Sequence, residues 1–180
     1  MADTSFNPLG HISIGVRDID VSRAFYSAVL EPIGLHLVFD SETEKEPQQT
    51  TTQPAEDSMA KGETTTAAPK VQRTHTRTLG YGRDAENELL NIFEFGAEAA
   101  APGPGFHLAL NAPSRDAVLR FHASALGFGG QNNGLPGVRK HYGKHYYAAF
   151  VVDPDGWRLE AVCKDAVPDH DAGEGETEAP

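Results

Sequence analysis

The sequence has one cysteine, Cys163, among its 180 residues, and this excludes an internal disulfide. A lone cysteine is consistent with a reducing compartment. No run approaches the roughly 20 apolar residues that a membrane-spanning helix needs. The first ten residues, MADTSFNPLG, contain no basic region followed by an apolar stretch. We therefore expect a cytoplasmic protein without a membrane span or a secretory signal.

Positive charge is also scarce, since the formal net charge is −11. Six of the acids lie in residues 165–180, which contain no Lys or Arg, and six more lie in residues 41–70 beside three lysines. These segments carry −6 and −3, which leaves about −2 for the remainder. Such a chain has no basic surface for nucleic acid or an anionic membrane, so we expect neither as a partner.

Large apolar side chains are almost missing from residues 41–70, where Met59 is the one large aliphatic residue and no aromatic residue occurs. Such a segment buries too little apolar surface to offset its ordering entropy, so we predict a disordered insertion there. The acidic tail at 165–180 is predicted to behave in the same way. Residues 96–105, GAEAAAPGPG, are predicted to be a linker.

What remains is two similar modules, at 9–95 and 106–164. HISIGV at 11–16 and HLALNA at 107–112 each begin with a histidine that leads an apolar run. At an offset of 96, identical residues also recur at 20/116, 25/121, 30/126 and 34/130. Such a repeat indicates an internally duplicated unit.

Each module is predicted to have the order β-α-β-β-β. Its first strand carries the histidine, and N-cap residues, Asp18 or Asp20 and then Ser114, precede the helices. The other strands are expected at 35–40, 74–81 and 89–95, and at 138–142, 146–152 and 158–163, with DPDG at 153–156 as a turn.

Alternation along the strands separates the two histidines from the apolar stripes. Ile12, Ile14 and Val16 share one face and are expected to pack on the helix, so His11 lies on the other face. The same pattern in the second module places His107 opposite its apolar residues. Glu160 lies mid-strand in RLEAVC, where a carboxylate is costly unless it is paired, hydrogen-bonded or bound to a metal.

Two imidazoles and a carboxylate on a shared face would form a facial triad for a divalent ion. A single strand histidine is more often partly exposed or bonded to a backbone carbonyl, and a single strand glutamate more often lies solvated on an edge. The duplication of the histidines favours the metal site.

The stretch GVRKHYGKHYYAAF at 137–150 concentrates further candidates. Arg139 could bind an anion, His141 could transfer a proton, and Tyr146 and Tyr147 could donate phenolic hydrogen bonds. One of the two tyrosines must point inward, and alternation alone does not say which. An exposed hairpin explains the stretch equally well.

Five residues are expected to have no catalytic role. We expect His36, His75 and His122 at the surface, Cys163 in the core, and Trp157 as a cover over a loop.

Three stretches resemble the vicinal oxygen chelate superfamily, which includes glyoxalase I, bleomycin-resistance proteins, fosfomycin-resistance enzymes and extradiol dioxygenases. They are HISIGVRDIDVSRAFYSAVLEPIGL, GFHLALNAPSRDAVLRFHASAL and YYAAFVVDPDGWRLEAVCK. The similarity is closest to small glyoxalase-like proteins. It implies an α+β fold in which two βαβββ modules pair into a curved, cup-like mixed sheet with helices outside, around a divalent metal such as Zn, Ni, Fe or Mn.

The resemblance also implies a ligand set. The family's two histidines fall on His11 and His107, and its last-strand glutamate falls on Glu160. A further glutamate, on the last strand of the first module, is replaced here by Asn91, which could offer an amide oxygen but is neither an anion nor a base. The nearby Glu94 has the opposite strand parity and is expected to face the helix.

The activity implied is lyase or isomerase chemistry on a small vicinal-oxygen substrate, through a metal-stabilised enediolate. Because Asn91 departs from the glyoxalase I pattern, the two-histidine, one-carboxylate set also resembles the Fe(II) site of a ring-cleaving dioxygenase. A third alternative is a non-catalytic protein that binds a small molecule, as bleomycin-resistance proteins do. The modules could pair within one chain or between two chains of a homodimer.

Overall fold

A computed structural model describes residues 9–43 and 77–166 of the chain. The expected insertion at 41–70 and tail at 165–180 fall outside these ranges except for their first few residues. The first module contains β1 (Ile12–Val16), α1 (Ile19–Leu30), η1 (Glu31–Ile33), β2 (His36–Asp40), β3 (Thr78–Gly82) and β4 (Glu88–Glu94). After η2 (Gly96–Glu98), the second contains β5 (Leu108–Asn111), α2 (Arg115–Gly127), β6 (Gln131–Val138), β7 (Tyr147–Val152) and β8 (Arg158–Cys163).

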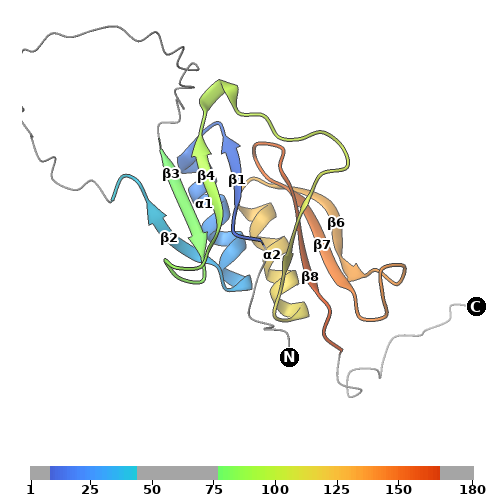
Figure 1. Cartoon of the computed structure of the whole chain (residues 1–180). Helices are drawn as coiled ribbons and strands as arrows, with labels where there is room; N and C mark the ends of the chain where they lie inside the picture. Colours follow the sequence, from blue (N-terminus) through green and yellow to red (C-terminus); the bar gives the residue numbers. More distant parts are fainter. Residues whose placement is uncertain (1–8, 44–76, 167–180) are drawn as a thin grey trace, which may run out of the picture.

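The strands form two four-stranded sheets with the same topology. The first sheet has the order β1-β4-β3-β2 and the second the order β5-β8-β7-β6 (Figure 1). In each, the first strand pairs in parallel with the last strand of its module, and the other pairings are antiparallel. The predicted α+β fold with paired βαβββ modules is confirmed.

Local sequence explains where the helices begin and end. Asp18 caps α1 by accepting hydrogen bonds from the backbone nitrogens of Asp20 and Val21, and Ser114 caps α2 through the nitrogen of Ala117. Gly34 ends η1 at a φ of 80°, in the left-handed region that glycine adopts without strain.

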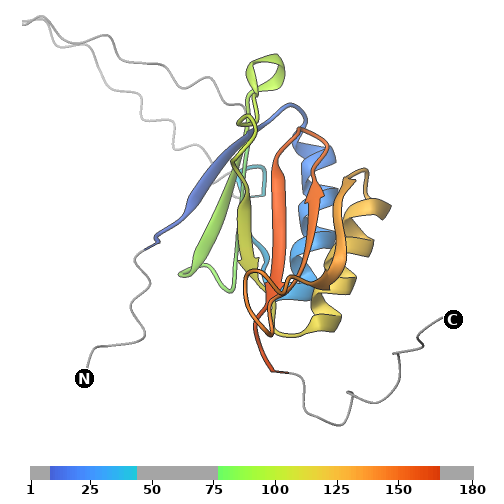
Figure 2. The ribbon, with the colours of Figure 1, turned by 90° about the vertical axis from the view of Figure 1, so that its right-hand side faces the viewer.

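The two helices meet in one shared core. α1 covers one face of the first sheet, α2 covers one face of the second, and the helices contact each other (Figures 1 and 2). Phe25 and Phe121, which occupy equivalent positions in the two modules, are both fully buried in this core. The opposite face of each sheet, called here its open face, therefore points away from the core.

The turn between β7 and β8 joins the modules. The hydroxyl of Tyr26 on α1 donates to Oδ2 of Asp153 at 2.8 Å, and the indole nitrogen of Trp157 donates to the carbonyl of Gly15 at 3.0 Å. Asp155 accepts from Nε of Arg17 at 2.7 Å. The DPDG turn thus holds the second module against the junction of β1 and α1.

Two sequence expectations need correction. Residues 131–138 form β6, whereas the strand was expected at 138–142, because the Gly and Pro residues of QNNGLPGV disguise an irregular edge strand. His122 is 6% exposed and hydrogen-bonds Asn132 at 2.9 Å, since β6 packs over that side of α2. His36 is exposed as expected, and His75 lies outside the described residues.

Two other expectations are confirmed. Cys163 is buried in the core. Glu94 faces the helix, where its Oε1 accepts from the backbone nitrogen of Ile19 at 3.4 Å. Within the described ranges, no helix is long and apolar enough to cross a membrane.

Candidate metal centre

His107 and Glu160 meet on the open face of the second sheet. His107 directly precedes β5, Glu160 lies on β8, and these neighbouring parallel strands bring Nε2 of His107 to 3.0 Å from Oε2 of Glu160. The Glu160 side chain is 3% exposed, whereas that of His107 is 47% exposed. A buried carboxylate therefore lies beneath an accessible imidazole.

This spacing suits two ligands of one ion. Two ligand atoms at about 2.1 Å from a divalent metal lie about 3 Å apart when they meet at a right angle, as in octahedral coordination, and about 3.4 Å apart in tetrahedral coordination. A carboxylate this deeply buried also needs a charged or hydrogen-bonding partner to offset its desolvation. The donor types and their separation fit a divalent cation.

Tyr146 holds the other oxygen of the same carboxylate. Its hydroxyl donates to Oε1 of Glu160 at 2.6 Å. Burial, together with the hydrogen bond to Glu160 and its negative charge, raises the pKa of Tyr146 to about 12. The phenol therefore stays protonated at neutral pH and orients the carboxylate so that Oε2 faces His107.

Replacing Tyr146 by phenylalanine removes this orientation and leaves the ring in place. We expect Tyr146→Phe to weaken Zn²⁺ binding by about 10- to 100-fold, as is usual when a group that orients a metal ligand is lost. Calorimetric titration with Zn²⁺ measures the effect. Tyr142→Phe is the matched control, because the Tyr142 ring stacks near Tyr146 at 5.2 Å between centroids and lies 63% exposed.

Arg139 and His141, two other candidates from 137–150, lie near the pair formed by His107 and Glu160 without contacting it directly. The Arg139 guanidinium lies over the Phe150 ring, 5.4 Å from its centroid, and Phe150 is the β7 neighbour of Glu160. His141 is exposed and its ring is tilted against that of Tyr142, with their ring centroids 4.1 Å apart. Arg139 therefore flanks the candidate site, and His141 lies at its outer edge.

Tyr147 occupies the opposite side of β7. It pairs with Cys163 and packs against the core, with the Arg115 guanidinium 5.0 Å from its ring centroid. Of the two tyrosines, Tyr146 is therefore the one on the open face. Phe150 is a further neighbour of the site, missing from the candidates above, although strand alternation from Tyr146 through Ala148 reaches it.

His11 and Asn91 lie on the open face of the first sheet. β1 and β4 pair with Ser13 beside Asn91, and His11 is exposed just before β1. The Oδ1 atom of Asn91 is buried and has no hydrogen-bond partner. In the two described ranges, no three His, Cys, Asp or Glu side chains are close enough to share a metal ion, so one chain does not bring His11 to His107 and Glu160.

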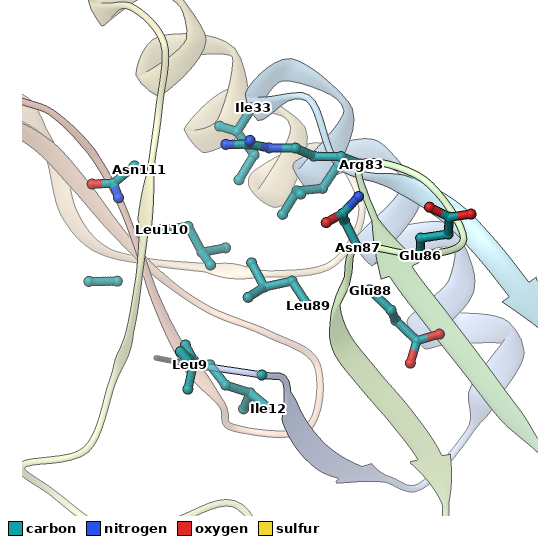
Figure 3. Close-up of a pocket in the computed structure, with 13 residues that line it drawn as sticks. Leu9, Ile12, Ile33, Arg83, Glu86, Asn87, Glu88, Leu89, Leu110 and Asn111 are labelled. Carbon is teal, nitrogen blue, oxygen red and sulfur yellow. The ribbon is translucent and has the colours of Figure 1, made fainter. Parts of the chain in front are cut away.

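An open cavity of about 810 Å³ lies between the modules, apart from this pair (Figure 3). Apolar side chains such as Ile12, Ile33 and Leu110 line it together with polar ones such as Arg83 and Glu86. Neither His107 nor Glu160 lines it.

Comparison with known proteins agrees with this architecture. Residues 9–161 match the model of the Glyoxalase/Bleomycin resistance protein/Dioxygenase superfamily. The chain belongs to this superfamily. Its members commonly use divalent metal ions and bind small molecules. No curated protein matches the chain at a significant level.

Among solved structures, the superfamily fold recurs. A glyoxalase/bleomycin resistance protein from Albidiferax ferrireducens T118 is 23% identical, with a TM-score of 0.57 over 88% of this chain and 100% of that one. Glyoxalase I from Zea mays is 18% identical, with a TM-score of 0.57 over 87% of this chain and 46% of that one. The fosfomycin resistance protein FosX from Listeria monocytogenes is 12% identical, with a TM-score of 0.52 over 89% and 95%. At these identities the likeness concerns the fold alone.

Proposed function

We propose that this chain is a metal-dependent, glyoxalase-like lyase or isomerase acting on a small vicinal-oxygen substrate. The observation that carries the proposal is the contact of His107 Nε2 with the buried carboxylate of Glu160 at 3.0 Å. A divalent ion bound there would act as a Lewis acid on two neighbouring substrate oxygens. Zn, Ni, Fe and Mn are the candidate ions.

The roles of the protein groups follow from their positions. His107 and Glu160 bind the ion from the second sheet, and Tyr146 fixes the orientation of Glu160. Arg139, above Phe150, attracts an anionic group of the substrate to this face.

His11 completes the ligand set from a second copy of the chain. Within the described residues of one chain, no third His, Cys, Asp or Glu side chain lies close enough to share an ion with His107 and Glu160. Two copies can form such a cup if the first sheet of one copy lies against the second sheet of the other. The open faces of the two sheets then line the cup, and the helices lie outside it. We therefore propose a homodimer with two cups.

Mixing two defective variants tests this assembly. His11→Ala and Glu160→Gln each damage both cups of their own dimer. When equal amounts of the two variants reassort at random, half of the dimers are mixed, and each mixed dimer has one undamaged cup. About a quarter of all cups are therefore intact. Tight Zn²⁺ binding should therefore return to about a quarter of the wild-type stoichiometry. A mixture that binds no more than its separate components would place the site within one chain.

Activity is tested with a substrate panel. Protein stripped with a chelator is reloaded with Zn²⁺, Ni²⁺ or Fe²⁺ and given either a methylglyoxal–glutathione adduct or catechol. We expect turnover of the α-oxo aldehyde adduct that depends on added metal. Ring cleavage of catechol with Fe²⁺ and oxygen would instead support a dioxygenase.

A non-catalytic small-molecule binder is the second candidate. It is favoured by the lack of a three-ligand cluster in the described part of one chain. This function predicts ligand binding that survives chelation and no turnover of either compound in the panel.

A further inference from the structure

Glu88 lies on the open face of the first sheet although strand alternation predicts the opposite. Leu90 and Ile92 are buried towards the helix, so strict alternation would place Glu88 beside them. The pairing of β3 with β4 is irregular here, because Tyr81 pairs with Leu90 whereas Gly82 pairs with Glu88. Leu89 is the extra residue of this β-bulge, and a bulge of this kind re-aims the neighbouring side chains.

The position of the carboxylate is clear from its contact with Gly80. Leu79 and Tyr81 point towards α1, so Gly80 faces the open side of the sheet. A Cβ atom on Gly80 would collide with Oε2 and Cδ of Glu88. The carboxylate therefore occupies the space that the missing side chain of Gly80 leaves.

Asn91 is directly beside this carboxylate. Gly80 and Asn91 are paired across β3 and β4, so the carboxylate of Glu88 over Gly80 shares the open face with the Asn91 side chain. Within the described ranges no hydrogen bond or ion pair engages the side chain of Glu88, and Oδ1 of Asn91 is buried without a partner. Two oxygen acceptors without donors thus lie together on the sheet that carries His11.

The Glu88 side chain is half-buried. Glu88 lines the cavity between the modules, and its carboxylate points away from Leu89 and Leu110 (Figure 3). An anion in this position is free to bind a cation that approaches the open face.

We propose that Glu88 supplies the anionic oxygen that the first sheet contributes to the metal centre, in place of the neutral Asn91. This inference rests on the proposed function, since it adds a ligand to the same metal. It gives the centre two carboxylates, Glu88 and Glu160, on the two sheets that form one cup. Asn91, with its unpartnered Oδ1, accepts a hydrogen bond from a metal-bound water or a substrate hydroxyl.

The first test is Zn²⁺ titration of chelator-stripped, full-length protein by calorimetry. Glu88→Gln keeps the side-chain shape and removes the charge, and we expect Zn²⁺ affinity to fall by at least about tenfold. Glu86→Gln is the matched control, since Glu86 is exposed two residues away in the same hairpin, and it should stay within about twofold of wild type.

A second variant moves the Glu88 carboxylate and leaves its charge in place. Gly80→Ala displaces the Glu88 carboxylate and should reproduce the loss of affinity, whereas Gly103→Ala, where a Cβ meets nothing within 4 Å, should not. Thermal unfolding of the stripped proteins confirms that each variant is folded.

The outcomes separate the two proposals. Wild-type affinity in Glu88→Gln, together with lost binding in His107→Ala, would overturn the role of Glu88 and leave the metal centre intact. Wild-type affinity in His107→Ala would overturn the metal centre itself.

Discussion

Replacing Glu160 by glutamine is expected to abolish tight metal binding and metal-dependent turnover without unfolding the protein. The glutamine side chain retains the shape of the glutamate but lacks the charge that binds the cation. Because the loss of groups that only orient a ligand already costs about 10- to 100-fold in affinity, we expect a loss greater than about 100-fold here. Zn²⁺ titration and a turnover assay measure the two effects.

Although Glu160→Gln should lose metal binding, the metal-free variant should be at least as stable as the metal-free wild type. Glu160 is 2% exposed, and in the part of the chain that the structure describes its carboxylate contacts two side-chain partners directly, Tyr146 and His107. Replacing a buried charge by a neutral isostere removes its desolvation cost. Chelator-stripped Glu160→Gln should therefore unfold at a urea concentration equal to or above that of stripped wild type. A large loss of stability would show that Glu160 serves the fold rather than the site.

Removing the side chain of Asp153 is expected to cost about 2–4 kcal/mol of stability. Asp153 is 2% exposed and accepts from the hydroxyl of Tyr26 and from the backbone nitrogens of Asp155 and Trp157. In Asp153→Ala these three donors lose their acceptor, and buried unsatisfied donors cost about 1–3 kcal/mol each, partly offset by removal of a buried charge. Urea unfolding at pH 7.5 measures the loss.

Asp153→Asn is the matched variant and adds a pH dependence. Burial raises the pKa of Asp153 to about 6 despite its hydrogen bonds. The folded protein therefore takes up a proton at this group more readily than the unfolded chain, whose Asp pKa is about 3.9. Protonation stabilises the fold, so this group adds about 1 kcal/mol as the pH falls from 7.5 to 5.

The asparagine variant lacks this contribution. Its stability should change less than that of wild type between pH 7.5 and 5, and at pH 7.5 it should be close to that of wild type. Equal pH dependence in both proteins would rule out Asp153 as the responsible group.

The sequence predicts the half of the site that lies within one module. The order β-α-β-β-β places the first and last strands of a module side by side, so His107 and Glu160, on equivalent faces, are expected to meet. Strand alternation likewise separates Glu94, which faces the helix, from the open face.

Strand alternation does not determine the other features of the site. Whether Tyr146 or Tyr147 faces Glu160 is set by where the 139–146 turn ends and β7 begins, and Glu88 is re-aimed by a bulge that no residue type announces. The separation of His11 from His107 and Glu160 depends on how the two modules are placed relative to each other, which strand alternation does not determine. Both helices have an apolar face, and the sequence does not specify which surface each face covers.

The most direct test of the metal centre is an anomalous-scattering map from crystals grown with Zn²⁺. We expect a peak about 2 Å from both Nε2 of His107 and Oε2 of Glu160, with His11 and Glu88 of a second copy completing the metal's ligands. A map with no peak between those two atoms, at saturating Zn²⁺, would contradict the proposed metal centre.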